Sequence, residues 1–259
     1  MEQSYNPFSL AGKTILVTGA SSGIGRATAI ECSKMGATLI LSAIPGESDL
    51  LQGVLDEMDG CGHAIVPADL KEEEEIRALA MNVAPLDGVV FAAGTLSVKP
   101  LAFYSMKNIQ DAFSVNTFAC MSLTKELVTA KKLMENSSLV FISSVASGLV
   151  TARTLGLYSA SKAAIDSFSK QCAVELADRK IRSNTINPGI IQTRMVDSVA
   201  SMMMADPKDV VNSLERMHLL NRFGKPEEVA WMAVYLLCDA SRFVTGASLL
   251  IDGGLHMNL

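Results

Sequence analysis

The chain has 259 residues, a length that suits one large domain with a sizeable core. Its 22 basic and 27 acidic side chains give a net charge of −5, and no cluster of Lys or Arg offers a surface for nucleic acid. The longest apolar run, 229–238, is too short to span a membrane, and the first residues do not resemble a signal peptide. Five scattered cysteines without a Cys-x-x-Cys pair, and only three histidines, argue against a disulfide framework and a metal centre. We therefore expect a globular cytoplasmic protein without membrane or nucleic-acid partners.

Apolar, β-rich runs alternate with amphipathic helical patterns along the whole chain. Most of the expected strands are continuously apolar, as strands buried on both faces are: 14–17, 38–41, 64–66, 88–91, 139–142, 181–187 and 248–251. The expected helices include 24–35, 106–134, 158–176 and 226–238, and the glutamates at 72–75 suit the first turn of another. The alternation predicts the α/β class: a doubly wound, Rossmann-type parallel sheet of about seven strands, with helices on both faces, in a single domain, 1–259.

A glycine-rich turn, 18–25, follows the first expected strand and opens the first helix. Gly19 permits a tight turn, Gly23 lets the backbone approach a pyrophosphate, and Gly25 allows the helix to pack closely on the strand. The phosphates would lie at the helix N-terminus, where unpaired N–H groups and the helix dipole favour anions. Glycine triplets also occur in ordinary tight turns, so the position after the first strand is what favours nucleotide binding.

The same turn also fits a different chemistry. Gly19-Ala20-Ser21-Ser22-Gly23 matches G-x-S-x-G, the nucleophile elbow of α/β-hydrolases. In those enzymes several strands precede the elbow, whereas only one expected strand precedes Gly19. A hydrolase would also need an acid and a later histidine, and nothing in the sequence around His218 or His256 supports that role. Hydrolysis is therefore the weaker alternative.

Two widely separated motifs point to one enzyme family. The glycine spacing is T-G-x-x-x-G-I-G, and Tyr158-Ser159-Ala160-Ser161-Lys162 forms a Y-x-x-x-K preceded by Ser143-Ser144 at a strand end. Together they resemble the short-chain dehydrogenase/reductase family, and the overall pattern is most similar to its 3-oxoacyl-(acyl-carrier-protein) reductase branch. The resemblance covers 10–254, with further family-like pieces at Asp69, Asn116, 187–189, Thr193, 222–228 and 251–254. One departure is Phe91-Ala92-Ala93-Gly94, where the family usually has N-N-A-G.

The resemblance implies a catalytic tetrad of Ser144, Tyr158, Lys162 and Asn116. Tyr158 and Lys162 are four residues apart, so they share one face of a helix. A fixed ammonium group stabilises a nearby phenolate and makes the tyrosine a better acid or base near neutral pH. In the family the tyrosine exchanges a proton with the substrate oxygen, the serine binds that oxygen, and the asparagine holds a proton-relaying water. Strand alternation directs the side chain of Ser143 the other way.

The resemblance also implies a nicotinamide cofactor. Its contacts would come from the glycine turn, the ends of the strands and the tetrad: Gly19, Ser21, Ser22, Gly23, Ile24, Gly25, Ala43, Asp69, Leu70, Ala93, Gly94, Tyr158, Lys162, Pro188, Gly189, Ile191 and Thr193. No metal ligand is expected.

The residues after the second strand bear on the choice of cofactor. Members that prefer NAD usually carry an acidic residue where Ala43 stands, and members that prefer NADP often carry a basic one at Ile44 or Ser22. Neither is present here. Without the carboxylate the main barrier to a 2′-phosphate is gone, and the hydroxyls of Ser21, Ser22 and Ser42 could donate to one. We therefore expect NADP(H), with NAD(H) left open.

The stretch 194–221 occupies the position of the family's substrate lid. It is rich in apolar residues: Met195, Val196, Met202, Met203, Met204, Val210, Val211, Leu214 and Met217. Methionine adapts to varied ligands, so these residues either form an apolar pocket for a carbonyl or alcohol substrate, such as an acyl-linked one, or pack the lid helices. An acidic carrier protein would need basic contacts, and Arg179, Lys180 and Arg182 are candidates.

Two helices carry more apolar residues than one core stripe needs. These residues are Phe113, Phe118, Met121, Leu123, Leu127 and Val128 in 106–134, and Ile165, Phe168, Cys172 and Val174 in 158–176. In the family these helices and the region beyond Thr245 form two-fold contacts, so we expect a homotetramer, with a homodimer as fallback. The alternative is packing under neighbouring loops. A non-catalytic nucleotide-binding regulator on the same fold is a further alternative, although the complete tetrad disfavours it.

Overall fold

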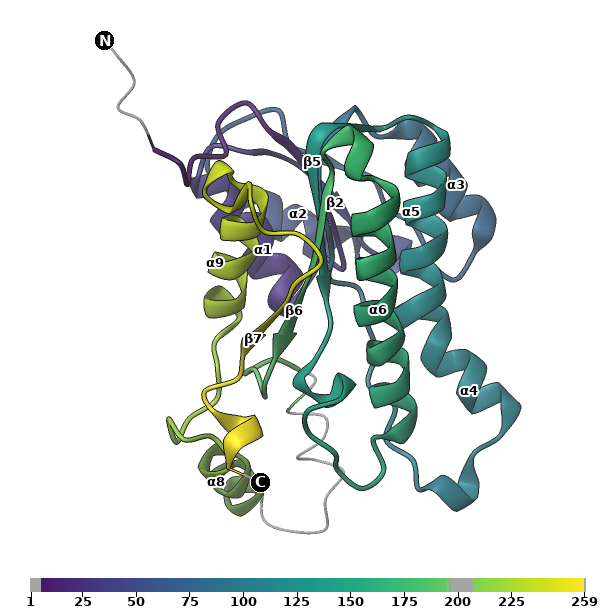
Figure 1. The fold of residues 1–259 in the computed structure, drawn as a ribbon, viewed down its shortest axis with the longest axis vertical. Helices are drawn as coiled ribbons and strands as arrows, with labels where there is room; N and C mark the ends of the chain where they lie inside the picture. Colours follow the sequence, from purple (N-terminus) through teal and green to yellow (C-terminus); the bar gives the residue numbers. More distant parts are fainter. Residues whose placement is uncertain (1–5, 195, 197–206, 259) are drawn as a thin grey trace.

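A parallel sheet of seven strands forms the centre of the molecule in the computed structural model, which describes residues 6–194, 196 and 207–258 (Figure 1). The strands are β1 (Thr14–Thr18), β2 (Thr38–Ser42), β3 (Ala64–Ile65), β4 (Leu86–Phe91), β5 (Leu133–Ile142), β6 (Arg182–Pro188) and β7 (Ser248–Ile251). Their order across the sheet is β3-β2-β1-β4-β5-β6-β7, and every neighbouring pair is parallel. The predicted α/β class and parallel sheet are confirmed.

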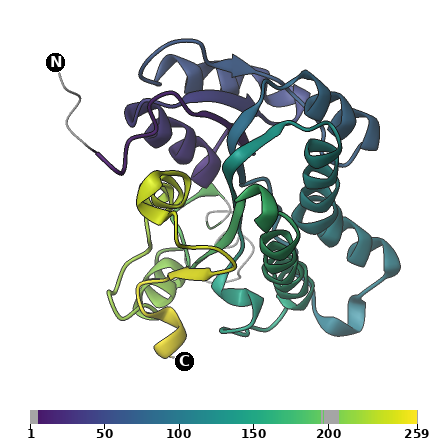
Figure 2. The ribbon, with the colours of Figure 1, turned by 45° about the horizontal axis from the view of Figure 1, so that its top comes forward.

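Helices cover both faces of this sheet, as the continuously apolar strands require. They are α1 (Gly23–Lys34), α2 (Ser48–Asp56), α3 (Glu73–Asn82), α4 (Met106–Phe113), α5 (Ala119–Thr129), α6 (Gly156–Glu175), α8 (Pro207–Arg216) and α9 (Pro226–Leu237). One core cluster joins the sheet to α1, α2 and α9, and a second joins it to α3, α5 and α6. Figure 2 shows the same two layers from a tilted direction. None of the helices in the described part is both long and apolar enough to cross a membrane.

The strand order reverses between β1 and β4. From β1 the chain first builds outward through β2 and β3, and it then returns to place β4 on the other side of β1. At such a switch point the loops beyond the carboxyl ends of the two strands lead to opposite faces and leave a crevice, which is where α/β proteins bind ligands. The residues after β1 and β4 therefore define where a site is expected.

The region predicted as one helix, 106–134, is divided into three parts. After α4, the backbone forms a π-helical turn over Ser114–Phe118 before α5 continues to Thr129. Lys131 has a left-handed φ of 53°, which ends the helix, and β5 already begins at Leu133. The prediction was wrong at the C-terminal end because the apolar residues at 133–134 belong to the sheet, where Leu133 pairs with Leu86.

Candidate active site

The glycine turn lies at the switch point, between β1 and α1. Gly19 has a φ of +64° and packs so closely on the next strand that a Cβ atom would lie 2.7 Å from the Cα atom of Ala93. A Cβ atom at Gly25 would lie 2.1 Å from the carbonyl oxygen of Gly19. Gly23 has a φ of +54° and begins α1. Each glycine is thus required by the backbone path itself.

The first turn of α1 offers unpaired hydrogen-bond donors. Ser22 occupies the N-cap position, but its side chain makes no capping hydrogen bond. The first hydrogen bond of the helix runs from the Arg26 N–H to the Ser22 carbonyl oxygen, at 3.1 Å. The preceding N–H groups, which belong to Gly23, Ile24 and Gly25, lack an intrahelical acceptor and are suited to an anion such as a pyrophosphate. This part of the chain fits a dinucleotide.

The glycine turn contacts a carboxylate group, that of Glu47, which the sequence analysis did not predict there. The Ser21 hydroxyl donates a hydrogen bond of 2.5 Å to Glu47, which ends a short 3-10 turn after β2. Ser42 is 1% exposed and Arg26 is paired with Glu57, so neither is placed as an open phosphate donor. Of the three serines proposed for a 2′-phosphate, Ser21 is engaged by Glu47, whereas the hydroxyl of Ser42 is buried without a hydrogen-bond partner among the described residues.

Beside the glycine turn is a hollow of about 350 Å³. Ser21, Ser22 and Gly23 line it together with Arg26 and Arg194. Asp49 and Glu57 also line the hollow, and Glu57 is paired with Arg26, so its two cationic side chains are matched by two carboxylates. The hollow therefore offers a ligand the free N–H groups of the helix start rather than a net positive charge.

The residues predicted to contact the cofactor after β2 and β3 are Ala43, Asp69 and Leu70. Ala43 is 7% exposed and Leu70 is 9% exposed, so both offer mainly backbone to a ligand. The Asp69 N–H donates to Glu75 at 2.7 Å, and the Asp69 carboxylate accepts a 2.9 Å hydrogen bond from the Lys71 N–H. Asp69 is therefore held in a fixed turn that leaves it half-buried.

Lys162 is a buried cation at the centre of the candidate site. Its side chain is 5% exposed, and its Nζ atom donates to the carbonyl oxygen of Ile142, the last residue of β5, at 2.7 Å. Nζ lies 5.9 Å from the centre of the Tyr158 ring, and a Cβ atom at Gly94 would lie 3.4 Å from it. Among the described residues the Ile142 carbonyl oxygen is its one hydrogen-bond acceptor, so the ammonium group retains donors for a ligand.

Asn116 lies in the π-helical turn and is 1% exposed. Its side-chain oxygen accepts from the Thr95 N–H at 2.7 Å, and its amide nitrogen donates to the Thr95 carbonyl oxygen and to the Ser161 hydroxyl. The side chain thus fastens the segment after β4 to α6. The side-chain amide is thus fully engaged, and the main-chain carbonyl oxygen of Asn116 accepts from the Cys120 thiol at 3.6 Å.

Ser144 follows β5 and faces the same region. Its hydroxyl oxygen accepts from the Ala146 N–H at 3.1 Å, which leaves its proton free to be donated. Ser143 instead donates to the Lys162 carbonyl oxygen, so the two neighbouring serines point in different directions. The Asn187 amide donates to the Ser144 carbonyl oxygen at 3.2 Å and fixes this strand end.

Ser147, Asp166 and Ser161 support the site, and the sequence analysis assigned none of them a role. Asn187 also donates to Ser147 and to Asp166, and Ser147 donates to Asp166 in turn. Ser161 donates to the Tyr158 carbonyl oxygen while accepting from Asn116. Such residues resemble any surface polar group in a sequence, and only the fold shows that they brace β6 and the start of α6, the helix that carries Tyr158 and Lys162.

A thiol near the site is unreactive by its environment. Burial raises the pKa of Cys120 to about 11, although the Lys162 ammonium acts in the opposite direction. A thiol is nucleophilic as the thiolate, so Cys120 serves packing rather than chemistry.

The loop after β6 faces the crevice from the other side. A Cβ atom at Gly189 would lie 2.9 Å from the Cα atom of Asp252, so only glycine fits there. The Gly189 N–H donates to the Ile251 carbonyl oxygen at 2.9 Å and continues the sheet. In contrast, the N–H groups of Ile191 and Thr193 have no acceptor among the described residues, and they can donate to a ligand.

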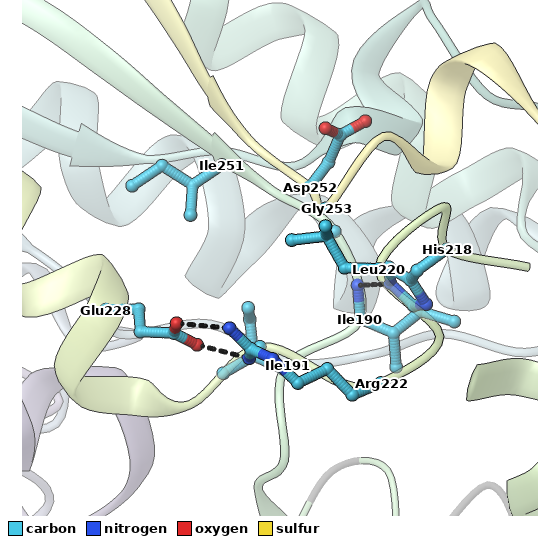
Figure 3. A pocket seen from close by; sticks show the side chains of 11 residues that line it. Ile190, Ile191, His218, Leu220, Arg222, Glu228, Ile251, Asp252 and Gly253 are labelled. Atoms are coloured by element: carbon cyan, nitrogen blue, oxygen red, sulfur yellow. Dashed lines mark hydrogen bonds and ion pairs between the residues drawn. The ribbon is translucent and has the colours of Figure 1, made fainter. Parts of the chain in front are cut away.

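Behind this loop is a closed hollow of about 100 Å³, shown in Figure 3. Arg222 makes two hydrogen bonds to Glu228, of 2.7 and 2.8 Å. These bonds, helped by the Lys225 N–H, lower the pKa of Glu228 to about 2, so the pair stays charged at neutral pH. The hollow is small for a whole dinucleotide, and it lies between the loop residues Gly189–Ile191 and the side chains of His218 and Arg222.

The basic residues considered for a carrier protein lie away from the site. Arg182 begins β6, and Pro188 ends it at the crevice, so the two ends are about 20 Å apart at the usual rise of a strand. Arg182 is buried and donates to the Leu236 carbonyl oxygen, while Lys180 is paired with Glu135. The suggestion that Arg179, Lys180 and Arg182 flank the site is wrong, because they precede the strand rather than follow it.

Part of the lid lies outside the described residues, including Met195, Met202, Met203 and Met204. Within α8, Val210 is buried, and Val211 and Leu214 are half-buried. Met217, just after this helix, packs with Val145, Val150 and Leu255. The described part of the lid region thus uses its apolar residues for packing on the body.

The histidines do not support a hydrolase. His63 interacts with the backbone of Leu39 and Asp59, and His256 with Asp252. His218 contacts only main-chain groups through its ring nitrogens. Ser21 donates to Glu47 and has no histidine partner among the described residues, so the G-x-S-x-G pattern does not form a nucleophile with its base.

Comparisons with known proteins agree with this geometry. The family model described as enoyl-(acyl-carrier-protein) reductase matches residues 19–256. The oxidoreductase UcpA of Salmonella typhimurium is 32% identical over 95% of both chains. The 3-oxoacyl-[acyl-carrier-protein] reductase FabG of Thermotoga maritima is 33% identical over 95% of this chain and 98% of its own.

The similarity extends to solved structures. The active-site complex of Pseudomonas aeruginosa RhlG with NADP superposes with a TM-score of 0.87, at 30% identity, over 97% of this chain and all of that chain. With the glycine turn, the Tyr158–Lys162 helix face and the strand order in place, the chain belongs to the short-chain dehydrogenase/reductase family of oxidoreductases.

Proposed function

We propose that this enzyme transfers a hydride between NADP(H) and a carbonyl or alcohol substrate that is apolar near the reacting carbon. The observation that carries the proposal is the buried Lys162 ammonium between Gly94 and the Tyr158 ring, with donors to spare. When bound, the nicotinamide supplies or accepts the hydride. The protein must then bind the dinucleotide, fix the substrate oxygen and move one proton.

Each tetrad residue is suited to one of these tasks. The Ser144 hydroxyl has a free proton to donate to the substrate oxygen, which holds the charge that develops there. Tyr158 exchanges a proton with the same oxygen, and the Lys162 ammonium group lies 5.9 Å from the centre of its ring. Lys162 also offers N–H donors to the ribose of the dinucleotide. Asn116 holds the segment after β4 against α6 and so keeps Gly94 next to Lys162.

The decisive experiment replaces the proton donor. We expect Tyr158→Phe to lower kcat by roughly 100- to 10,000-fold, because the ring stays in place without its ionisable proton. The dissociation constant for NADPH, measured by nicotinamide fluorescence, should stay near the wild-type value. Tyr235→Phe, which removes a hydroxyl from α9 on the other layer, is the matched control. Near-normal turnover by Tyr158→Phe would rule out the mechanism, and cofactor-free ester hydrolysis would revive the alternative chemistry.

An apolar rim beside the tetrad supports the proposed substrate class. Leu101, Phe103 and Met106 are 78%, 69% and 68% exposed on the segment that leads into α4. Leu149, 53% exposed, lies on the segment before α6, and the Lys99 N–H joins the two segments through the Thr154 carbonyl oxygen. Large exposed apolar groups of this kind gather where an apolar ligand binds.

Among carbonyl substrates, a 3-oxoacyl thioester is our specific candidate. Its acyl chain matches the apolar rim, and FabG of Thermotoga maritima, a relative, is a 3-oxoacyl-[acyl-carrier-protein] reductase. In the same assay, kcat/KM should rise with the chain length of the ketone. A preference for short or sugar-like ketones would contradict this assignment. The carrier itself would have to bind without Arg182, which is buried.

The preference for NADP(H) rests on two points. Ala43 leaves no carboxylate at the end of β2, and the structural neighbour from Pseudomonas aeruginosa holds NADP. Glu47 opposes it, since a 2′-phosphate near Ser21 would require this carboxylate to turn away. We also propose a homotetramer acting in the cytoplasm.

A further inference from the structure

We infer that His218 is a positioning residue that holds the nicotinamide-side loop, 188–193, and that it does so only in its neutral form. This inference rests on the proposed function, because it concerns a loop that we assign to the cofactor. His218 has no part in the tetrad, and it is 1% exposed.

All hydrogen-bonding capacity of the ring is committed to the main chain. The Nε2 atom accepts from the Ile190 N–H at 3.3 Å, a bond visible in Figure 3. The Nδ1 atom faces the carbonyl oxygens of Leu214 and Glu215, at 3.2 and 3.3 Å, in the last turn of α8. A carbonyl oxygen only accepts and an N–H only donates, so Nδ1 must carry the proton and Nε2 must not. The surroundings therefore fix one neutral tautomer.

The Ile190 bond differs from the other bonds of this loop. The N–H groups of Gly189 and Gln192 donate to backbone carbonyl oxygens of Ile251 and Gly224, and the Gly224 N–H returns a bond to Ile190. Among the described residues, Ile190 is the member of the loop whose N–H is held by a side chain. The free N–H of Ile191 comes next in the chain, so the orientation of that donor depends on the His218 bond.

Packing holds the ring in this orientation. The Phe223 ring contacts it edge-on at 6.1 Å between centres, and a Cβ atom at Gly253 would lie 3.5 Å from its Cδ2 atom. The ring thus connects three segments, namely the end of α8, the loop after β6 and the segment after β7.

Protonation would turn the Nε2 acceptor into a donor that faces another donor. Histidine is the side chain that gains a proton between about pH 5 and 8, so the loop has a built-in sensitivity to acid. The charged groups around the ring come from every neighbouring segment: Glu215 and Arg216 at the end of α8, the Arg222–Glu228 pair, and the Asp252–His256 pair. Each carboxylate of the last two pairs already has a cationic or hydrogen-bonding partner, so neither is free to stabilise a protonated His218.

Two substitutions separate positioning from packing. His218→Gln places a carbonyl oxygen near the Nε2 position and can still accept from Ile190. His218→Asn keeps a donor near the Nδ1 position and cannot reach Ile190. Both variants lose the ring, so both should lose thermal stability to a similar extent.

The dissociation constants for NADPH and NADH, measured by fluorescence, give the result. We expect about a fivefold weaker binding for His218→Asn and a near-normal value for His218→Gln, as the loss of one hydrogen bond implies. Wild-type binding should weaken from pH 8 to pH 5.5, while that of His218→Gln should change less. His256 is present in both proteins, so its titration cancels in the comparison.

The outcomes are distinct. If the wild type binds neither dinucleotide, the proposed function fails and this inference fails with it. If the wild type binds but the two variants have equal dissociation constants, His218 is merely a packing residue and the proposed function stands. If neither variant folds, wild-type affinity that is independent of pH overturns the inference.

Discussion

Three of the four tetrad side chains are held by main-chain atoms. Lys162 donates to the Ile142 carbonyl oxygen, Asn116 bonds both backbone groups of Thr95, and Ser144 accepts from the Ala146 N–H. A substitution cannot remove a backbone partner, so these contacts depend on the path of the chain rather than on neighbouring side chains. At the scale of single residues, we therefore expect substitutions to change the preference between NADP(H) and NAD(H) more readily than the positions of Lys162, Asn116 and Ser144.

Glu47 is the residue at which that choice can be tested. We expect Glu47→Gln to strengthen NADPH binding by roughly fivefold and to leave NADH binding nearly unchanged, because it removes a negative charge beside Ser21. Asp49→Asn removes one negative charge from a nearby residue that lines the hollow beside the glycine turn, and it leaves the Ser21–Glu47 bond intact, so it is the matched control. Fluorescence titration with both dinucleotides measures the effect. An equal change for NADH and NADPH would show that Glu47 does not approach the 2′ position.

At the scale of elements, the turn between β1 and α1 joins two close approaches of the backbone. Gly19 contacts the segment after β4, and Gly25 contacts Gly19 itself. The turn is thus packed against both the neighbouring strand and its own helix. Its shape is set by the absence of side chains, which is also what exposes the helix N-terminus.

The corresponding prediction compares two Gly→Ala substitutions. Gly19→Ala introduces a Cβ atom 2.7 Å from backbone at a left-handed φ, so we expect a loss of stability of roughly 1–3 kcal/mol or more, together with loss of dinucleotide binding. Gly53 lies within α2 and has nothing within 4 Å, so Gly53→Ala should instead raise stability by about 0.5–1 kcal/mol. Thermal unfolding and fluorescence titration measure both effects. A Gly19→Ala variant that binds NADPH normally would contradict the role given to the turn.

At the scale of the whole molecule, several large apolar side chains are exposed without an evident role. Leu123, Leu127 and Ile165, counted as surplus in the sequence, are buried in this chain's own core. Others remain on the surface: Val174 on α6 is 73% exposed, and Phe243 before β7 is fully exposed. Of the predicted surplus, Phe118 and Val174 are the exposed members, so the surplus is smaller than expected. Val174 and Phe243 lie on different elements, and each is a candidate for one of two different subunit contacts.

We expect the wild type to be a tetramer by light scattering at micromolar concentration. Val174→Glu and Phe243→Glu should each reduce it to a dimer, because each places a charge in one of the two proposed contacts. Met81 is 61% exposed on α3, away from both regions, so Met81→Glu should leave the mass unchanged. A wild-type monomer would refute both the tetramer and the dimer.

The strands could be predicted because buried parallel strands are continuously apolar, and the glycine turn because its spacing is unusual. The C-terminal end of α5 could not be predicted, because nothing about a lysine indicates the positive φ that Lys131 adopts. Glu47 was overlooked because it lies four residues beyond Ala43, the position that is acidic in family members that prefer NAD. Arg182 was misjudged because proximity in sequence to a site-forming strand does not say which end of the strand a residue occupies.

The π-helical turn at Ser114–Phe118 makes the segment between α4 and α5 sensitive to the deletion or insertion of a residue. A π turn accommodates one extra residue, and one residue corresponds to about 100° of rotation around an α-helix. The phase of the helix therefore changes at Asn116: α4 packs against α6, whereas α5 packs against α3. Removing a single residue there would leave the composition almost the same and yet rotate one half of the helix away from its neighbour. The segment thus tolerates changes of residue type more readily than a change of residue number.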